Sequence, residues 1–260
     1  MKNNSVLENT IKRRLKNGEV IHCAWHQFGD PETAEVLVHC GWDVVLVDGE
    51  HGPMIYQDIM TCVRAVEAAG GEAICRIPSY DPLVLNKFLD AGVRSIMIPN
   101  VRTVEQAEAI AQACLYPPYG RRGYAAPCVR ASGFGRDKNY LANSRENLLL
   151  ILQIEHVEAI DNIEAMSKIP GVDMLFIGLN DMGGSIGKLE QLHTPEVVAL
   201  FDKSVEKMKK SGVMMGSIPG PTISEKDLMD KGFQLVAGPT NVMLLCEAAR
   251  AARERIKDLL

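Results

Sequence analysis

Titratable side chains stand directly after two apolar runs in the first third of this sequence. Asp48, Glu50 and His51 follow one run, and Arg76 follows the next. Because histidine exchanges protons near neutral pH, we expect His51 to be a general acid/base whose ring is oriented by Asp48, with Glu50 as a supporting group. Arg76 is flanked by apolar residues and needs an anionic partner, which is either a substrate carboxylate or keto oxygen or a salt bridge to Asp48 or Glu50.

Two carboxylates follow later apolar runs. Glu155 ends the longest of these runs and Asp181 follows the next one. Together they would offer oxygen ligands to one Mg²⁺ or Mn²⁺ ion, with water and substrate in the remaining positions. Gln153 shares a strand face with Glu155 and would reach the waters of the metal or the substrate. The alternative is that each carboxylate caps the next helix, which is less favourable for Glu155 because an unpaired buried carboxylate is costly.

The elements that must position these side chains alternate along the chain. Apolar runs typical of buried strands are separated by segments with helical spacing, such as 55–69, 104–115 and 196–210. The expected strands are 20–25, 44–48, 73–77, 95–98, 148–155, 174–177, 213–217 and 234–237. This rhythm predicts an α/β (β/α)8 barrel, in which the strand ends converge on one face. A Rossmann fold is disfavoured because no G-x-G-x-x-G follows the first strand.

Length and composition narrow the class of protein. The chain has 260 residues, of which 47% are hydrophobic, and we expect 1–260 to form a single barrel domain. A net charge of −5 and a lack of basic, aromatic-rich runs argue against a nucleic-acid partner. No apolar stretch of about 18 residues predicts a membrane span, and the N-terminus lacks the pattern of a signal peptide. The seven cysteines form no C-x-x-C pair, so we expect reduced thiols and a cytoplasmic protein.

One connection, residues 116–147, is unusually long. It contains Arg121, Arg122, Arg130 and Arg136 beside glycines, and one short helix is expected near 137–143. Connections of this length are usually functional or disordered. The arginines suit contacts with anionic ligands or with a partner subunit, and the alternative is a solvated surface loop.

Several motifs occur in one order along the chain, from about Lys16 to Cys246. They are Asp48-Gly49-Glu50-His51, Arg76-Ile77-Pro78, Leu89-Asp90-Ala91-Gly92, Tyr116-Pro117-Pro118-x-Gly120-x-Arg122-Gly123, Arg130-Ala131-Ser132, Gln153-Ile154-Glu155 and Phe176-Ile177-Gly178-x-x-Asp181. In this order and spacing the chain resembles the HpcH/HpaI-type class II pyruvate aldolases. The family includes 2-dehydro-3-deoxyglucarate aldolase and 4-hydroxy-2-oxoheptanedioate aldolase.

The resemblance implies a barrel of the phosphoenolpyruvate/pyruvate type and a metal-dependent aldolase that forms no Schiff base. Glu155 and Asp181 match the family's ligands for Mg²⁺, Mn²⁺ or Co²⁺, His51 with Asp48 its acid/base, and Arg76 its enolate-binding arginine. The carboxylate of a 2-oxo acid substrate would lie against the backbone of Gly178, Leu179, Asn180 and Asp181.

The resemblance also implies a homo-oligomer, either a trimer or a hexamer. The C-terminal helix would then be used in oligomerisation. Asp90 would reach a neighbour's site, and Arg122 and Arg130 would support the subunit contact.

Three segments depart from the family pattern, namely 124–129, 178–184 and 237–241. They surround the expected position of the second substrate, so the aldehyde is less defined than the pyruvate enolate. One alternative is related enolate chemistry, such as oxaloacetate decarboxylation or a citrate-synthase-like condensation with a keto acid or acyl-CoA. Another is a non-catalytic barrel that binds a small acid, which the retained His51 and Arg76 argue against.

Overall fold

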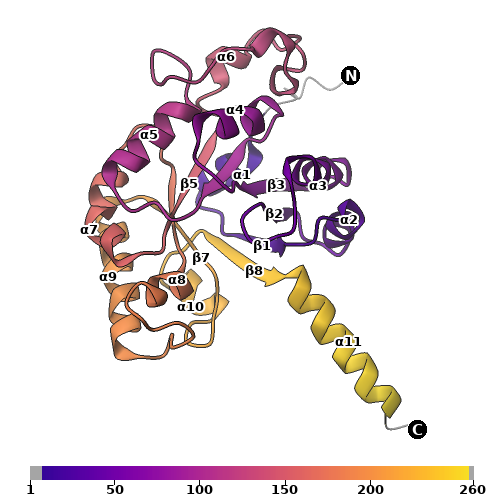
Figure 1. The fold of residues 1–260 in the computed structure, drawn as a ribbon, viewed down its shortest axis with the longest axis vertical. Helices are drawn as coiled ribbons and strands as arrows, with labels where there is room; N and C mark the ends of the chain where they lie inside the picture. The colour runs from indigo at the N-terminus through magenta and orange to yellow at the C-terminus, as the bar shows by residue number, and fades with distance from the viewer. Residues whose placement is uncertain (1–7, 258–260) are drawn as a thin grey trace.

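The computed structural model describes residues 8–257, and in it eight parallel strands close into a barrel (Figure 1). Each strand pairs with the next in sequence, and β8 pairs with β1. The strands are β1 (Ile21–His26), β2 (Val44–Asp48), β3 (Glu72–Arg76), β4 (Ser95–Ile98), β5 (Leu149–Ile154), β6 (Met174–Ile177), β7 (Met214–Ser217) and β8 (Leu235–Thr240). The predicted (β/α)8 barrel is confirmed. The terminal residues of the expected 1–260 domain, including the N-terminal segment considered for a signal peptide, lie outside the described range.

Helices connect the strands and surround the barrel (Figure 1). They are α1 (Thr10–Lys16), α2 (Pro31–His39), α3 (Tyr56–Ala68), α4 (Pro82–Asp90), α5 (Val104–Cys114), α6 (Tyr140–Asn143), α7 (Val157–Met166), α8 (Leu179–Gly184), α9 (Pro195–Ser211), α10 (Glu225–Asp230) and α11 (Asn241–Lys257), with short 3₁₀ helices η1 (Ala126–Cys128) and η2 (Arg130–Ser132). Several begin at side-chain caps, for example Asp30 before α2 and Asp81 before α4. Both of these caps are followed by a proline, whose φ angle is already helical.

The main differences from the sequence prediction lie in strand β8 and in the long connection. Strand β8 extends through Thr240, because β1 and β8 shift register between Cys23 and Trp25 and keep pairing past Pro239. Proline is normally excluded from central strands, and the predicted strand ended at residue 237, two residues before Pro239. In the long connection, α6 covers only the end of the expected 137–143 helix, and η1 and η2 were not expected.

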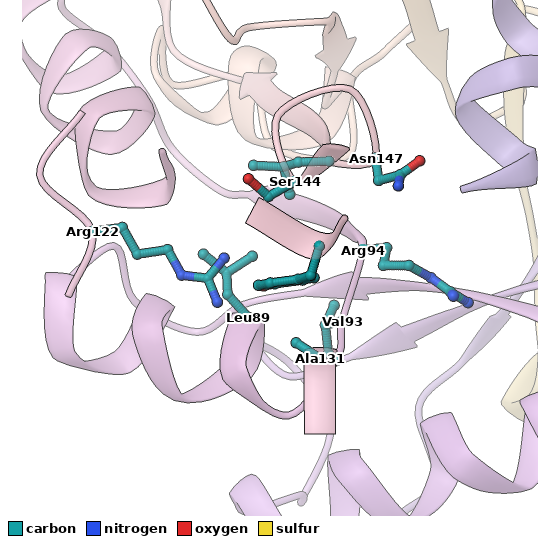
Figure 2. A pocket seen from close by; sticks show the side chains of 10 residues that line it. Leu89, Val93, Arg94, Arg122, Ala131, Ser144 and Asn147 are labelled. Atoms are coloured by element: carbon teal, nitrogen blue, oxygen red, sulfur yellow. The ribbon is translucent and has the colours of Figure 1, made fainter. Parts of the chain in front are cut away.

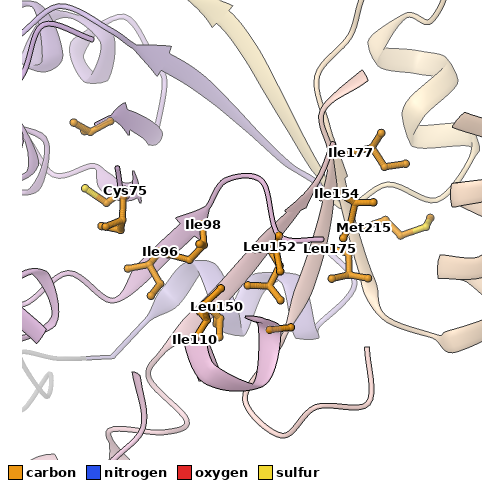
Figure 3. Close-up of a cluster of buried hydrophobic side chains, with 14 of the residues drawn as sticks. Cys75, Ile96, Ile98, Ile110, Leu150, Leu152, Ile154, Leu175, Ile177 and Met215 are labelled. Carbon is orange, nitrogen blue, oxygen red and sulfur yellow. The ribbon is translucent and has the colours of Figure 1, made fainter. Parts of the chain in front are cut away.

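Apolar side chains fill two layers, one inside the barrel and one between strands and helices. Alternate residues of β5 show the division, because Leu149 and Ile151 belong to the inner cluster and Leu150 and Leu152 to the outer one. Figure 3 shows part of the outer layer, in which strand residues such as Ile96 and Leu175 are drawn with their neighbours. This two-residue period fixes which strand residues point along the barrel axis.

Helix α1 closes the amino-terminal end of the barrel. Its Ile11 and Leu15 belong to the inner cluster. Lys12, on the same helix, pairs with Asp173, which directly precedes β6. Because α1 fills the amino-terminal end, an active site would lie at the opposite end, where the strands finish.

Helix α11 extends away from the barrel after β8 (Figure 1). Of its residues only Asn241 is buried, and Met243, Leu245 and Ile256 are each more than half exposed. Within residues 8–257, none of the helices has the length and apolar character needed to cross a membrane.

Candidate active site at the carboxyl ends of the strands

The inward-facing rows of side chains turn from apolar to polar where the strands end. In β2 the row Val44, Leu46 leads to Asp48, and in β5 the row Leu149, Ile151 leads to Gln153. By the same two-residue period, Arg76 ends the row of β3 and Glu155 lies one step beyond Gln153. All four polar side chains are buried. The barrel thus gathers them around its axis, as the sequence predicted for strand ends.

Asp48 and Arg76 form a buried bidentate ion pair. Arg76 Nε donates to Asp48 Oδ1 at 2.9 Å, and Nη2 donates to Oδ2 at 2.7 Å. Trp25 Nε1 donates to Oδ2 at 3.0 Å, and the guanidinium lies 4.7 Å from the centre of the Trp25 ring. Burial alone would raise the pKa of Asp48, but the hydrogen bonds and charge of Arg76 outweigh it and lower the pKa to about 2. Of the two partners considered for Arg76, the salt bridge to Asp48 is therefore present.

His51 lies differently from the expectation. Asp48 Oδ1 accepts a hydrogen bond from the backbone N–H of His51 at 3.3 Å and does not orient its ring. The nearest carboxylate to the ring is Glu50, with 3.8 Å between His51 Nε2 and Glu50 Oε2, and the His51 side chain is 61% exposed. The physical reason is that both oxygens of Asp48 are already bound by Arg76. Asp48 therefore shapes the backbone of the 48–51 turn, and Glu50, also 2.9 Å from Arg76 Nη1, stands between the arginine and the imidazole.

Glu155 is held in a crowded acidic environment. Its Oε1 accepts the backbone N–H of Asn100 at 2.6 Å, and its Oε2 accepts Gln153 Nε2 at 3.1 Å. Burial, followed by the negative charges of Glu50 and Asp181, raises its pKa to about 7. Ionised Glu155 is thus a buried anion that lacks a full counter-charge.

Gly178 and Asp181 border Glu155 from β6 and α8. A Cβ atom on Gly178 would lie 2.6 Å from Glu155 Oε2, so only glycine fits at this position. Asp181 is exposed in the first turn of α8, and its charge acts on Glu155. The intervening Leu179 and Asn180 place their backbone in that same turn, whose N–H groups lack helical partners.

The donor set fits a divalent cation. Gln153 Oε1 is buried without a hydrogen-bond partner, and the Nε2 of the same side chain donates to Glu155. Glu50 Oε2 is paired with Arg76 Nη1 at 2.9 Å, and its charge raises the pKa of Glu155. Hard oxygen ligands of this kind suit Mg²⁺ or Mn²⁺. Among residues 8–257, no cluster of three or more Asp, Glu, His or Cys side chains is arranged to hold a metal. A cation bound by Glu155 and Asp181 would therefore keep positions open for water and substrate.

The residues expected at a subunit contact have partners within the chain. Arg122 Nη2 donates to Asp90 Oδ1 at 2.6 Å, and its guanidinium lies 4.4 Å from the centre of the Tyr116 ring. Arg130 contacts Glu67 at 2.5 Å and donates to the carbonyl of Ala91. Both charges are balanced within the chain by carboxylates of α3 and α4, and the role of these arginines at a ligand or a neighbour stays a prediction.

Figure 2 shows the cavity beside this cluster, with Arg122, Leu89 and Ala131 along its walls. Its volume is about 30 Å³, which is room for little more than a water molecule. The cavity belongs to the packing of the long connection and is too small for a substrate.

Three residues around the site were missed by the sequence analysis. Trp25 and Gln27 both donate to Asp48 Oδ2, at 3.0 and 3.3 Å, and both lie at the end of β1. Asn100 has a positive φ of 52°, which turns its N–H toward Glu155. The available signals were a tryptophan in the inner row of a strand and an asparagine, one of the few residues that tolerate left-handed backbone, directly after β4.

Comparisons with known proteins agree with this geometry. Residues 23–248 match the family model described as HpcH/HpaI aldolase/citrate lyase. The hydroxypyruvate/pyruvate aldolase of Roseobacter denitrificans is 32% identical over 96% of this chain and 98% of its own length. The solved structure of an HpcH/HpaI aldolase/citrate lyase family protein from Burkholderia cenocepacia superposes with a TM-score of 0.90 at 30% identity, covering 96% of this chain and 99% of the other. A solved citrate synthase superposes with a TM-score of 0.84 at 25% identity, covering 95% and 97%.

Proposed function

The chain belongs to the HpcH/HpaI aldolase/citrate lyase family and is a carbon–carbon lyase of the aldolase type; from this premise we propose that it cleaves and forms a C–C bond next to a pyruvate enolate. The substrate would be a 4-hydroxy-2-oxo or 2-keto-3-deoxy acid, and the released partner an aldehyde. The observation that carries the proposal is the buried, undercompensated Glu155 beside the unpaired Oε1 of Gln153.

Glu155 and Asp181 are the residues that would hold a divalent cation, Mg²⁺, Mn²⁺ or Co²⁺. When bound there, such a cation supplies Lewis-acid stabilisation of the negative charge of an enolate. The backbone N–H groups of Leu179, Asn180 and Asp181, which follow Gly178, would bind the substrate carboxylate, and Gln153 would orient the keto acid from the strand floor.

His51 would move the proton. In the cleavage direction its imidazole takes the proton of the C4 hydroxyl, the C3–C4 bond breaks, the aldehyde leaves and the electron pair remains as the enolate. The exposed ring suits a group that meets the substrate at the mouth of the barrel. Arg76 contributes fixed positive charge near the keto oxygen, and Asp48 holds Arg76 in place.

Chelation tests the cation. Retro-aldol activity should vanish after dialysis against chelator and return with Mg²⁺, Mn²⁺ or Co²⁺, whereas borohydride with pyruvate should trap no covalent adduct. Full activity in chelator would refute the metal assignment. Isothermal titration of the metal-free protein measures Mn²⁺ affinity without turnover. Asp181→Asn should weaken Mn²⁺ binding and leave the free energy of unfolding nearly unchanged, because the Asp181 side chain is exposed.

His51→Gln tests the proton carrier. We expect kcat to fall by about 10²–10⁴-fold with little change in the free energy of unfolding, because the side chain is largely exposed. Since the substitution leaves the cation ligands intact, Mn²⁺ affinity should be unchanged. A variant with wild-type kcat would assign the proton transfer to another group.

A second candidate is condensation of the same enolate with a keto acid or acyl-CoA, or oxaloacetate decarboxylation. The superposition with a citrate synthase supports this second candidate. A panel of aldehydes, keto acids and acyl-CoAs with pyruvate or oxaloacetate separates the two, and turnover with aldehydes alone supports the aldolase.

We propose in addition that the protein is a cytoplasmic homo-oligomer, a trimer or hexamer, in which α11 packs on a neighbour. The support is the exposure of Met243, Leu245 and Ile256 on a helix that leaves the barrel. All seven cysteines are free, as is usual in reducing compartments. Removal of residues 242–257 should lower the molecular mass of the assembly measured by light scattering.

A further inference from the structure

A buried amide joins the first residue of α11 to the end of β1. Asn241 is 7% exposed. Its Oδ1 accepts the backbone N–H of Gln27 at 2.9 Å, and its Nδ2 lies 3.0 Å from His26 Nδ1. Because Oδ1 is fixed by a backbone donor, the side chain has one orientation, with its NH₂ group toward the imidazole.

His26 is thereby held in one protonation state. Nδ2 of Asn241 can only donate, so His26 Nδ1 must be the acceptor and the ring proton resides on Nε2. The ring is fully buried, and burial lowers its pKa to about 4, so it is neutral at physiological pH. One asparagine thus satisfies the imidazole Nδ1 and the backbone N–H of Gln27, while the buried Nε2 of His26 has no hydrogen-bond partner.

Gln27 in turn contacts Asp48 and lies close to the turn that carries His51. Its side-chain Nε2 donates to Asp48 Oδ2 at 3.3 Å. Its carbonyl oxygen lies under the turn that follows His51, where a Cβ atom on Gly52 would approach it to 2.7 Å. The position of Gln27 therefore limits both the Asp48 carboxylate and the turn that carries His51.

We propose that Asn241 is a positioning residue for the reaction, which fixes the 48–51 turn through Gln27 and so links the base of α11 to the active site. The inference rests on the proposed function for the role of His51. It adds that two consecutive contacts connect α11 to the turn that carries His51. The first joins Asn241 to Gln27, and the second joins Gln27 to Asp48. The link to Gln27 requires an acceptor at position 241, which alanine lacks and aspartate keeps, whereas the amide also donates to His26.

Asn241→Ala tests the link, with Asn9→Ala as the matched control. Asn9 is likewise a buried amide that ties the start of a helix to a strand, but at the opposite end of the barrel, where it donates to Arg94 O and Ser95 Oγ. Asn9→Ala removes at least as many hydrogen bonds, because Asn9 Oδ1 also accepts the backbone N–H of Lys12, and it should cost at least as much stability. Asn241→Ala should also lower kcat by about 10–100-fold, as misplacement of a catalytic group does, with KM little changed, whereas Asn9→Ala should leave kcat unchanged.

The indole N–H of Trp25 gives a readout that needs no turnover. Because it donates to Asp48, its ¹H–¹⁵N signal reports the position of that carboxylate, and Trp42→Phe assigns it. Asn241→Ala should shift this signal and Asn9→Ala should not. Equal effects of the two substitutions on kcat, or an unmoved Trp25 signal, would overturn the proposal. If the protein lacks aldolase activity altogether, the proposed function fails while this signal still decides the link.

Asn241→Asp keeps the acceptor for Gln27 and removes the donor to His26. We expect kcat and the Trp25 signal to stay near their wild-type values, and ¹⁵N spectra to show His26 with its proton moved to Nδ1, facing the carboxylate. A loss of kcat as large as that of Asn241→Ala would contradict the role of Gln27 as the link. This variant also keeps the test decisive if Asn241→Ala does not fold.

Discussion

The two ends of the barrel both bury charged side chains, but only the amino-terminal end balances them within the fold. There Lys12 Nζ lies 2.8 Å from Asp173 Oδ1 and also donates to the carbonyl of Leu148 at 2.5 Å. The other oxygen of Asp173 accepts the backbone N–H of Leu150 at 3.0 Å. One cation and one anion are each bound by further polar groups, so the ion pair is closed within the fold, although burial still raises the pKa of Asp173 above its usual value.

At the carboxyl end the charges do not balance. Asp48 and Arg76 form as good a pair as Lys12 and Asp173, but Glu50, Glu155 and Asp181 add negative charge around it. Only Arg76 faces them from within the buried group. A buried charge that lacks a partner lowers stability, so the unbalanced end is the one that the proposed cation and anionic substrate would complete.

The comparison predicts that breaking the buried pair at the carboxyl end affects both stability and catalysis. Arg76→Ala leaves Asp48 buried and unpaired, so the free energy of unfolding should fall by about 3–5 kcal/mol. Loss of the fixed positive charge should also lower kcat/KM by about 10²–10³-fold. Chemical denaturation and retro-aldol kinetics measure the two effects separately.

A double variant separates the structural part from the catalytic part. Arg76→Met with Asp48→Asn removes both charges, so most of the lost stability should return while activity stays low. Recovery of activity together with stability would mean that Arg76 serves only the fold.

The equivalent substitution at the amino-terminal end should affect stability alone. Lys12→Met leaves Asp173 without its cation, and the free energy of unfolding should fall by about 3–5 kcal/mol. Because α1 is at the far end of the barrel from His51, kcat should be unchanged at temperatures where the variant is folded. A loss of kcat comparable to that of Arg76→Ala would show that the two ends are not independent.

The sequence predicted the carboxyl end better than the amino-terminal end. Apolar runs followed by Asp48, Arg76 and Glu155 mark strand ends, and a two-residue period places those side chains on the axis. The α1 plug was not predicted, because Lys12 occurs among other basic residues and only its contact with Asp173, distant in sequence, shows that it is buried.

The sequence also left open which side chains pair with one another within the site. His51 and Asp48 are close along the chain, which suggested that the carboxylate orients the ring. In the fold, Arg76 from the neighbouring strand binds the Asp48 carboxylate because the two residues are paired in register. Contacts of this kind depend on strand register and side-chain reach, which local spacing does not encode. The same holds for Asn100, whose backbone conformation aims its N–H at Glu155.

Glu155→Gln in the metal-free protein tests the charge imbalance itself, and its effect should be the smallest of those predicted. Because the pKa of Glu155 is raised to about 7 in the folded state, folding favours its protonated form. Wild-type stability should therefore fall as the pH rises from the ordinary carboxyl pKa through 7, and glutamine, which never ionises, should remove that fall. We expect the variant to be more stable than wild type by about 1–3 kcal/mol at pH 8 and equal to it near pH 4. Mn²⁺ should raise the Tm of the wild type at pH 8 and leave that of the variant unchanged. A wild-type protein whose metal-free stability is independent of pH over this range would show that the carboxyl end is balanced after all, and the contrast between the two ends would be lost.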